Sequence, residues 1–317
     1  MAVSLRPEFS FLEDARAPDE NAAVLKRREV ALELGSHEAA AAGYLASQEL
    51  IDCINTALAV GAPLLLTGEP GTGKTQAAYY AAHRLGVGAP HKLDVTSETT
   101  IHDLFYEFDR VAYFHDAQVE KQRPERARYF TPGPLWKAFE RSQQGETAIV
   151  LLDELDKAPR DFPNDLLNAL DQHEFTIREL SKTIRADPRR PPLVILTSNS
   201  EKRLPEPLLR RCIYHFIPFD EAQVRKIVQR RRDFLAEDST AHELAIQRFL
   251  ELRKLPGLRK KPATGELLLW LTVLSARRGL SAKHLSGPLH ELPALFCLIK
   301  DRDDLERIAG STPASPG

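Results

Sequence analysis

The sequence is poor in cysteine and has no pattern that would put its cysteines to use. Its three cysteines are odd in number, widely spaced, and without a CxxC pair or a neighbouring histidine cluster. This arrangement excludes a disulfide framework and a zinc site of ordinary ligand spacing. We therefore expect three buried thiols, at Cys53, Cys212 and Cys297.

Long apolar runs are also lacking. The longest, such as Leu292–Ile299, fall far short of the roughly 20 apolar residues that a membrane-spanning helix needs. The N-terminal segment MAVSLRPEFSFLED has neither the basic start nor the apolar stretch of a secretion signal. We therefore expect a cytoplasmic protein with no membrane span.

The chain has little excess charge of either sign. Its 43 Lys and Arg residues nearly balance 45 Asp and Glu residues, which gives a formal net charge of −2. With this balance, the net charge of the protein does not attract it to nucleic acid or to anionic lipid. Local basic patches that bind such partners are still possible.

What the chain does have is the composition of an ordinary globular protein. With 43% hydrophobic and 28% charged residues over 317 positions, it has enough apolar side chains for a substantial core. This length favours one large domain with a smaller second one over a single core.

Short apolar runs bounded by turn residues alternate with helical patterns. A helix is expected between Ser47 and Gly61, and others over Lys74–Leu85 and Asp165–Leu170. Strand and helix in alternation are typical of a parallel sheet, so the predicted fold class is α/β. The runs that predict buried strands are Pro63–Thr67, Lys92–Val95, Ala148–Leu152, Leu193–Thr197 and Ile213–Ile217.

The pattern changes after Pro218, where helical periodicity continues without further strands. Asp220 begins a pattern like a capping box, and helical patterns follow over Ala241–Leu255 and Glu266–Arg277. At the other end, ordered structure is expected to begin near Tyr44, because no clean periodicity precedes it. The expected organisation is an N-terminal arm over residues 1–38, an α/β core over 39–219, a helical domain over 220–308 and a flexible tail over 309–317.

One segment matches the pattern G-x-x-x-x-G-K-[ST], which is typical of phosphate-binding loops. It stands between an apolar strand and a helix, where backbone N–H groups and the helix N-terminus can surround phosphate oxygens. Lys74 adds positive charge, and the Thr75 hydroxyl is a ligand for Mg²⁺. A mere glycine-rich turn is the weaker alternative, because strand and helix are both in place. The predicted nucleotide-binding residues are Gly68, Glu69, Pro70, Gly71, Thr72, Gly73, Lys74, Thr75 and Gln76.

Two acids follow the expected strand Ala148–Leu152. Nucleotides bind at the carboxyl ends of parallel strands in folds of this class, so we expect Asp153 and Glu154 beside the phosphate loop. Asp153 is expected to hold Mg²⁺, and Glu154 to orient and activate the attacking water. Taken alone, such acids more often cap a helix. Together with the phosphate loop they predict binding and hydrolysis of a nucleoside triphosphate.

Polar side chains also follow the next expected strand. Asn199 lies just beyond Leu193–Thr197, where its amide can reach the γ-phosphate or the attacking water. Arg210 and Arg211 precede the last strand, and guanidinium groups suit bidentate phosphate contact. The alternatives are an asparagine that only turns the chain and a solvated helix end.

The order of these motifs resembles that of an AAA+ ATPase, and more narrowly that of the MoxR branch. The resemblance covers about residues 40–280. The segments that carry it are Tyr44-Leu45-Ala46-Ser47 ahead of PLLLTGEPGTGKT, FTPGPL at 130–135, DELDKAPRDFPNDLLNAL at 153–170, TSN at 197–199 and LPEPLLRRC at 204–212.

The resemblance implies a doubly wound five-stranded parallel sheet with a helical lid, ATP and Mg²⁺ as cofactors, and a homo-oligomeric ring, usually a hexamer. It makes Asn199 the sensor-1 residue and Arg211 the arginine finger that reaches the neighbouring subunit's ATP, with Arg210 as its companion. Tyr44 and Leu45 fall where the adenine is usually flanked.

Two further segments match the family, and one departs from it. A hairpin is expected over Phe175–Arg185, and an insertion over Thr99–Arg128 whose aromatic side chains either line a ring pore or form a core. Where many relatives carry a sensor-2 arginine, this chain has none on the helix itself. Either Lys260 or Lys261 substitutes, or coupling to the lid is weak.

The leading interpretation is a ring-forming ATPase that remodels or matures a protein client, with a von Willebrand factor A-type partner as in MoxR relatives. A second is the ATPase of a nucleic-acid-acting or defence complex, which would use the basic clusters Arg225–Arg232 and Arg253–Lys261. Those clusters lie on expected helices without interleaved aromatics, which argues against nucleic acid as a partner. A third is a nucleotide-gated scaffold, against which the intact Glu154 and Arg211 argue.

Overall fold

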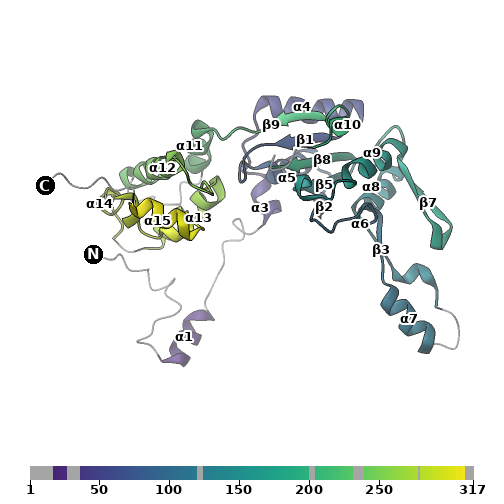
Figure 1. The fold of residues 1–317 in the computed structure, drawn as a ribbon, viewed down its shortest axis with the longest axis horizontal. Helices are drawn as coiled ribbons and strands as arrows, with labels where there is room; N and C mark the ends of the chain where they lie inside the picture. Colours follow the sequence, from purple (N-terminus) through teal and green to yellow (C-terminus); the bar gives the residue numbers. More distant parts are fainter. Residues whose placement is uncertain are drawn as a thin grey trace. The chain divides into compact units, whose positions relative to one another are not determined.

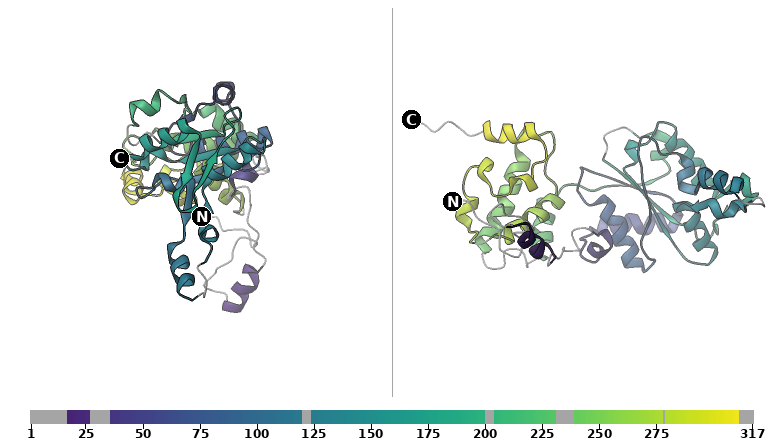
Figure 2. Two further views of the ribbon diagram at one scale, coloured as in Figure 1. Left: turned by 90° about the vertical axis from the view of Figure 1, so that its right-hand side faces the viewer. Right: turned by 90° about the horizontal axis from the view of Figure 1, so that it is seen from below.

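The structure is a computed structural model that describes residues 17–26, 36–119, 124–199, 204–230, 239–277 and 279–310. These residues fall into two compact units (Figure 1, Figure 2). One unit spans His37–Phe219, and the other consists of the chain from Asp220 onward together with the segment before His37. No helix in the described ranges is long and apolar enough to cross a bilayer.

The first unit is built on one five-stranded sheet in which every neighbouring pair of strands is parallel. Its strand order is β2-β5-β8-β1-β9, so the chain crosses over between strands as a doubly wound sheet requires. All five strands that the sequence predicts are present, and the predicted α/β class is confirmed. The strands are β1 (Leu64–Thr67), β2 (His91–Asp94), β5 (Ile149–Asp153), β8 (Leu193–Ser198) and β9 (Ile213–Phe216).

Both faces of this sheet are covered, because successive side chains of a strand point to opposite faces. On β5, Ile149 and Leu151 belong to the cluster beneath helices α4 and α5, whereas Val150 and Leu152 pack with α8 and α9. The sheet is thus the middle of three layers (Figure 1). The helices that cover it are α4 (Gln48–Val60), α5 (Lys74–Leu85), α8 (Pro134–Gln143) and α9 (Phe162–Gln172), and the short α3 (His37–Ala41) packs on α5.

Helix α4 begins and ends where the sequence predicts. The Ser47 hydroxyl accepts a hydrogen bond from the Leu50 N–H at 3.1 Å, which satisfies one of the free donors of the first turn. Gly61 ends the helix in the left-handed conformation, with φ 67°.

Two excursions extend from the first unit. The first is the predicted insertion, in which β3 and β4 pair antiparallel around α7. The second is the predicted hairpin, whose strands β6 and β7 also pair antiparallel. The elements are α6 (Ile101–Phe105), β3 (Tyr106–Phe108), α7 (Arg110–Val119), η2 (Arg126–Tyr129), β4 (Phe130–Pro132), η3 (Leu155–Lys157), β6 (Glu174–Ile177), η4 (Arg178–Leu180), β7 (Lys182–Arg185) and α10 (Glu206–Leu209).

Most aromatic side chains of the insertion pack against one another. The rings of Phe108 and Phe130 are stacked with centroids 4.6 Å apart, and Tyr113 meets Tyr129 edge-on at 5.4 Å. Tyr113 is buried, whereas Phe114 is 62% exposed. Of the two alternatives for these aromatics, the core interpretation therefore holds for Tyr113 and not for Phe114.

The second unit is helical from Asp220 onward. Its buried Trp270 donates its ring N–H to the Pro293 carbonyl at 2.7 Å. The fully buried Asp304 accepts from the N–H groups of Arg259 and Lys260 at 2.9 and 3.1 Å, which fixes the loop ahead of α13. The elements are α11 (Glu221–Arg230), α12 (Ser239–Lys254), α13 (Thr264–Ser275), α14 (Ala282–Leu285), η5 (Leu289–Glu291), η6 (Leu295–Cys297) and α15 (Arg302–Gly310), with α1 (Pro18–Leu25) in the N-terminal segment.

Two expectations from the sequence are wrong. Ordered structure does not begin near Tyr44, because α1 and α3 precede it, and α3 is held by its packing on α5 rather than by a periodic pattern of its own. Of the three cysteines only Cys297 is buried. Cys53 and Cys212 are partly exposed, since each lies at the margin of a hydrophobic cluster rather than inside it.

We expect Leu151→Ala to destabilise the first unit by about 2–5 kcal/mol, because Leu151 is fully buried in a central strand and truncation leaves a cavity. Denaturant unfolding followed by circular dichroism measures the loss. Leu85→Ala is the matched control, since Leu85 is 43% exposed, and it should cost less than about 1 kcal/mol. Equal losses in the two variants would contradict the three-layer packing.

Candidate functional site

The phosphate-loop motif joins the carboxyl end of β1 to the start of α5, and three of its glycines have positive φ angles. Any side chain at Gly68 would collide with the main chain, since a Cβ atom there would lie 2.4 Å from the Ile217 carbonyl oxygen. A Cβ atom at Gly73 would lie 3.0 Å from the ring of Tyr44. The motif therefore needs glycine at these positions both for its conformation and for space.

Lys74, the first residue of α5, lies inside this loop. Its side chain is buried, and its ammonium donates to the carbonyl oxygens of Gly68 and Glu69, both at 2.9 Å. Burial lowers the pKa of Lys74, and neighbouring carboxylates, of which Asp156 has the largest effect, oppose that shift. The loop thus encloses a cation at the N-terminus of a helix, which is the environment that binds phosphate.

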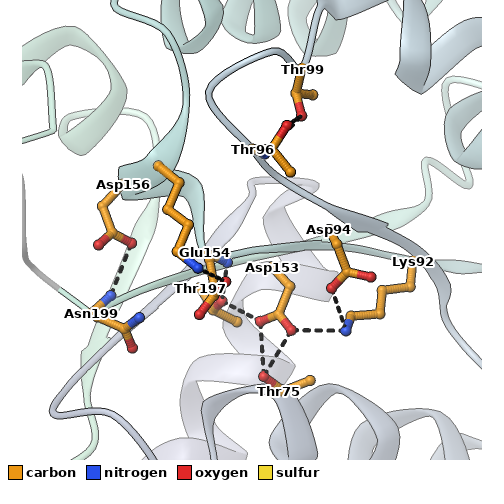
Figure 3. A network of polar contacts seen from close by, with 11 residues as sticks. Thr75, Lys92, Asp94, Thr96, Thr99, Asp153, Glu154, Asp156, Thr197 and Asn199 are labelled. Carbon is orange, nitrogen blue, oxygen red and sulfur yellow. Dashed lines mark hydrogen bonds and ion pairs between the residues drawn. The ribbon is translucent and has the colours of Figure 1, made fainter.

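The carboxylate of Asp153, at the end of β5, is the centre of a polar network (Figure 3). It accepts from the Thr75 hydroxyl at 2.8 and 3.1 Å and from the Thr197 hydroxyl at 2.6 Å. The Lys92 ammonium lies 3.0 Å from Oδ2 of Asp153 and 2.6 Å from a carboxylate oxygen of Asp94. The Asp153 side chain therefore joins helix α5 to strands β2, β5 and β8.

This network keeps Asp153 ionised. Burial raises the pKa of the carboxyl, but hydrogen bonds from Thr197, Thr75 and Lys92 outweigh burial and leave the pKa below its ordinary value. An ionised carboxylate beside a threonine hydroxyl is a pair of hard oxygen donors, which suits Mg²⁺. Among the residues that the structure describes, no group of three or more His, Cys, Asp or Glu side chains is arranged to hold a metal. Mg²⁺ held here would complete its shell with water and phosphate oxygens.

Glu154 follows Asp153 in a left-handed backbone conformation, with φ 60°. Such a conformation is unfavourable for a residue other than glycine, and the Glu154 N–H compensates by donating to the Thr197 hydroxyl at 2.9 Å. The Glu154 side chain is about half exposed, at 43%, and forms an ion pair with Lys157. It is thus accessible to a water molecule at the edge of the network.

Asn199 lies beyond the end of β8, at the same edge of the sheet (Figure 3). Its backbone N–H donates to a carboxylate oxygen of the buried Asp156 at 3.0 Å. This bond fixes the main chain at Asn199 relative to the segment that carries Glu154.

Arg210 and Arg211 are not part of this cluster. Ile213, at the start of β9, donates its N–H to the Pro63 carbonyl at 2.8 Å, so the arginines lie level with the start of β1. The phosphate loop follows the opposite end of β1, roughly 13 Å away for a strand of four residues. The half-exposed Arg211 side chain lies 3.5 Å from Asp171 and Arg210 pairs with Glu206.

Tyr44, one of the two residues expected near the adenine, lies against the loop and α5. Burial raises the pKa of the Tyr44 hydroxyl, and the Tyr44 ring lies 5.3 Å from that of Tyr80. Gln76 uses both ends of its amide on one residue: its nitrogen donates to the His37 carbonyl at 2.8 Å, and its oxygen lies 2.9 Å from the His37 ring nitrogen. Leu45 is partly buried beside Tyr44.

Several members of the network are absent from the sequence prediction, among them Thr197, Asp156 and Lys92. Thr197 precedes the predicted Asn199 by two residues, and only the pairing of β5 with β8 shows that it faces Asp153. Asp156 is one of several acids that follow the same strand, and nothing in the local sequence distinguishes it from the others. Lys92 left the clearest signal, because a charged residue inside an expected buried strand requires a partner.

Residues 63–212 match the family model described as an AAA domain of the dynein-related subfamily. No curated protein matches the chain. A solved structure of NtrX from Brucella abortus in complex with ADP is 17% identical with a TM-score of 0.48, over 96% of this chain and 64% of that one. NtrX from the same organism in complex with ATP is 17% identical with a TM-score of 0.48, over 94% of this chain and 69% of that one.

We expect Thr197→Val to raise the pKa of Asp153 and to lower the free energy of unfolding by about 1–3 kcal/mol at neutral pH, because two hydrogen bonds are lost. The Asp153 pKa is depressed in the folded protein, so its stabilisation is present above the pKa of the unfolded chain and is lost as pH falls through the folded value.

Unfolding measured at several pH values tests this expectation. The loss in free energy of unfolding of the variant, relative to the wild type, should become smaller once the pH falls below the ordinary aspartate pKa of about 3.9. Thr176→Val, on the exposed face of the β6–β7 hairpin, is the control and should show no such dependence. A deficit that stays constant at acid pH would contradict the role of the Asp153 charge.

Proposed function

From the match of residues 63–212 to the AAA domain model, we propose that the chain is an ATP hydrolase that binds Mg·ATP at its phosphate loop and works as a ring of identical subunits. The observation that carries the proposal is the hydrogen bond between the Thr75 hydroxyl and the Asp153 carboxylate. It holds the two expected Mg²⁺ ligands together at the end of a loop shaped for phosphate.

Each residue of the loop has a distinct task in this proposal. The backbone N–H groups of residues 71–75 bind phosphate oxygens, and Lys74 exchanges the carbonyl oxygens of Gly68 and Glu69 for phosphate. Thr75 and Asp153 hold Mg²⁺, which neutralises charge on the phosphates when it is bound. Tyr44, Leu45 and Gln76 flank the nucleotide.

Hydrolysis requires a base that faces water. Glu154 accepts a proton from the attacking water, and its exposure at the end of β5 supports this role. Asn199 orients the water or the γ-phosphate, which agrees with its anchored main chain at the neighbouring strand end.

Arg211 serves the ATP of a neighbouring subunit, with Arg210 as its companion. Its place at the amino edge of the sheet supports this assignment, because it is a strand length away from the phosphate loop of its own chain. A guanidinium group supplied in trans stabilises charge that develops on the transferred phosphoryl group.

The finer assignment rests on the order of sequence motifs. We propose that the chain is of the MoxR type, forms a hexamer and remodels a protein client together with a von Willebrand factor A-type partner. Either Lys260 or Lys261, just ahead of α13, substitutes for the missing sensor-2 arginine, or coupling to the lid is weak.

We expect Glu154→Gln to bind Mg·ATP as the wild type does and to lose about 10²–10⁴ in turnover, because the amide keeps the shape but accepts no proton. Titration with a fluorescent ATP analogue and a phosphate-release assay separate binding from hydrolysis. Lys74→Ala is the contrasting variant, and it should fail to bind. Wild-type turnover in Glu154→Gln would remove Glu154 as the base.

We expect Arg211→Ala to fold and bind ATP but to hydrolyse it about 10³–10⁵-fold more slowly. Mixing it with Lys74→Ala should restore part of the activity, since some interfaces then pair an intact loop with an intact arginine. Phosphate release from the mixture measures the rescue, and native mass spectrometry confirms that subunits have exchanged. Exchanged rings without rescue would argue against action in trans.

A further inference from the structure

Asp94 and Asp153 lie directly opposite each other at the ends of two neighbouring parallel strands. They are register partners in the β2–β5 ladder. Lys92 comes two residues before Asp94, so its side chain is on the same face of β2. Its ammonium lies 2.6 Å from Asp94 and 3.0 Å from Asp153 and therefore bridges the two carboxylates (Figure 3).

Two carboxylates in this position would repel each other without a cation between them. They would also offer hard oxygen donors from two strands, which is the kind of pair that divalent cations seek. Lys92 occupies the position that such a cation would take. A lysine ammonium is a compact charge with three donors, so it can serve both acids at once.

The bridge is more than an exposed surface contact. The side chains of Lys92 and Asp153 are 24% and 10% exposed, whereas Asp94 is 74% exposed. The Lys92 ammonium reaches a carboxylate on each of the two strands, so its charge faces both acids at once. Three donors, from Thr75, Thr197 and Lys92, contact the oxygens of Asp153 in the protein without nucleotide.

We propose that Lys92 is a positioning residue that acts as a built-in counter-ion. It keeps the Asp94–Asp153 pair from binding a divalent cation by itself and so reserves Asp153 for a cation that arrives with phosphate. The role toward a cation that arrives with phosphate rests on the proposed function. The effect on binding of a divalent cation by itself concerns the protein without nucleotide. No other group in the network supplies positive charge to Asp94 among the contacts of the described residues.

The decisive experiment measures binding of Mn²⁺ alone, without nucleotide, by electron paramagnetic resonance. In Lys92→Met the two acids lose their counter-ion, and we expect Mn²⁺ to bind at least about tenfold more tightly than in the wild type, since the pair is then uncompensated. Adding Asp94→Asn to Lys92→Met removes one of the two acids and should return the affinity to that of the wild type. Lys226→Met, an exposed lysine on α11, is the control and should change nothing.

Two further variants test whether the result depends on folding or on the charge of residue 92. Lys92→Gln serves as the second neutral variant if the apolar side chain prevents folding, and Lys92→Arg, which retains the charge, should behave as the wild type. Equal Mn²⁺ affinity in folded Lys92→Met or Lys92→Gln and the wild type would overturn the proposal. So would a gain that persists after Asp94→Asn.

Nucleotide binding is measured separately, so that the two proposals can fail independently. Wild-type protein that binds no ATP would end the proposed function and leave the Mn²⁺ result intact. If the wild-type protein binds ATP, Mg²⁺ should increase the ATP affinity of Lys92→Met less than that of the wild type. The reason is that the variant already holds the cation before nucleotide arrives. An unchanged effect of Mg²⁺ would contradict the positioning role.

Discussion

The carboxylate of Asp153 is the point on which the geometry of the site depends. It ends β5, and its two oxygens receive Thr75 from α5, Thr197 from β8 and Lys92 from β2. A short side chain with so many partners leaves little freedom for any of them, because moving one strand end breaks bonds to the others. The site is therefore a property of the whole sheet edge rather than of one loop.

The sheet itself explains why polar chemistry gathers at that edge. Its central strands are buried on both faces, so their interior positions carry only apolar side chains, as Leu64–Leu66 and Ile149–Leu152 show. Polar groups can enter where a strand ends and the chain turns, and Thr67, Asp153 and Ser198 are all found there. The same requirement made the strands predictable, since uninterrupted apolar runs with turn residues beyond them have few other uses in a chain of this composition.

What the sequence could not provide was the pairing between distant segments. The phosphate loop and the acids after β5 follow local patterns, and they were found by spacing alone. Thr197, Asp156 and Lys92 matter because of their partners, and a partner depends on strand order and register, which no local pattern encodes. The burial of Tyr113 beside the exposed Phe114 has the same origin, because both are aromatic and adjacent, and only the packing of α7 on its neighbours distinguishes them.

The close approach of Gly68 to Ile217 brings the start of the phosphate loop against the chain that follows β9. Ile217 is hydrogen-bonded to Thr67 through its N–H, and its carbonyl abuts the first glycine of the loop. Only Pro218 and Phe219 separate it from Asp220, where the second unit begins. The residue whose carbonyl bounds the phosphate loop therefore stands only three positions before the first residue of the second unit in the sequence.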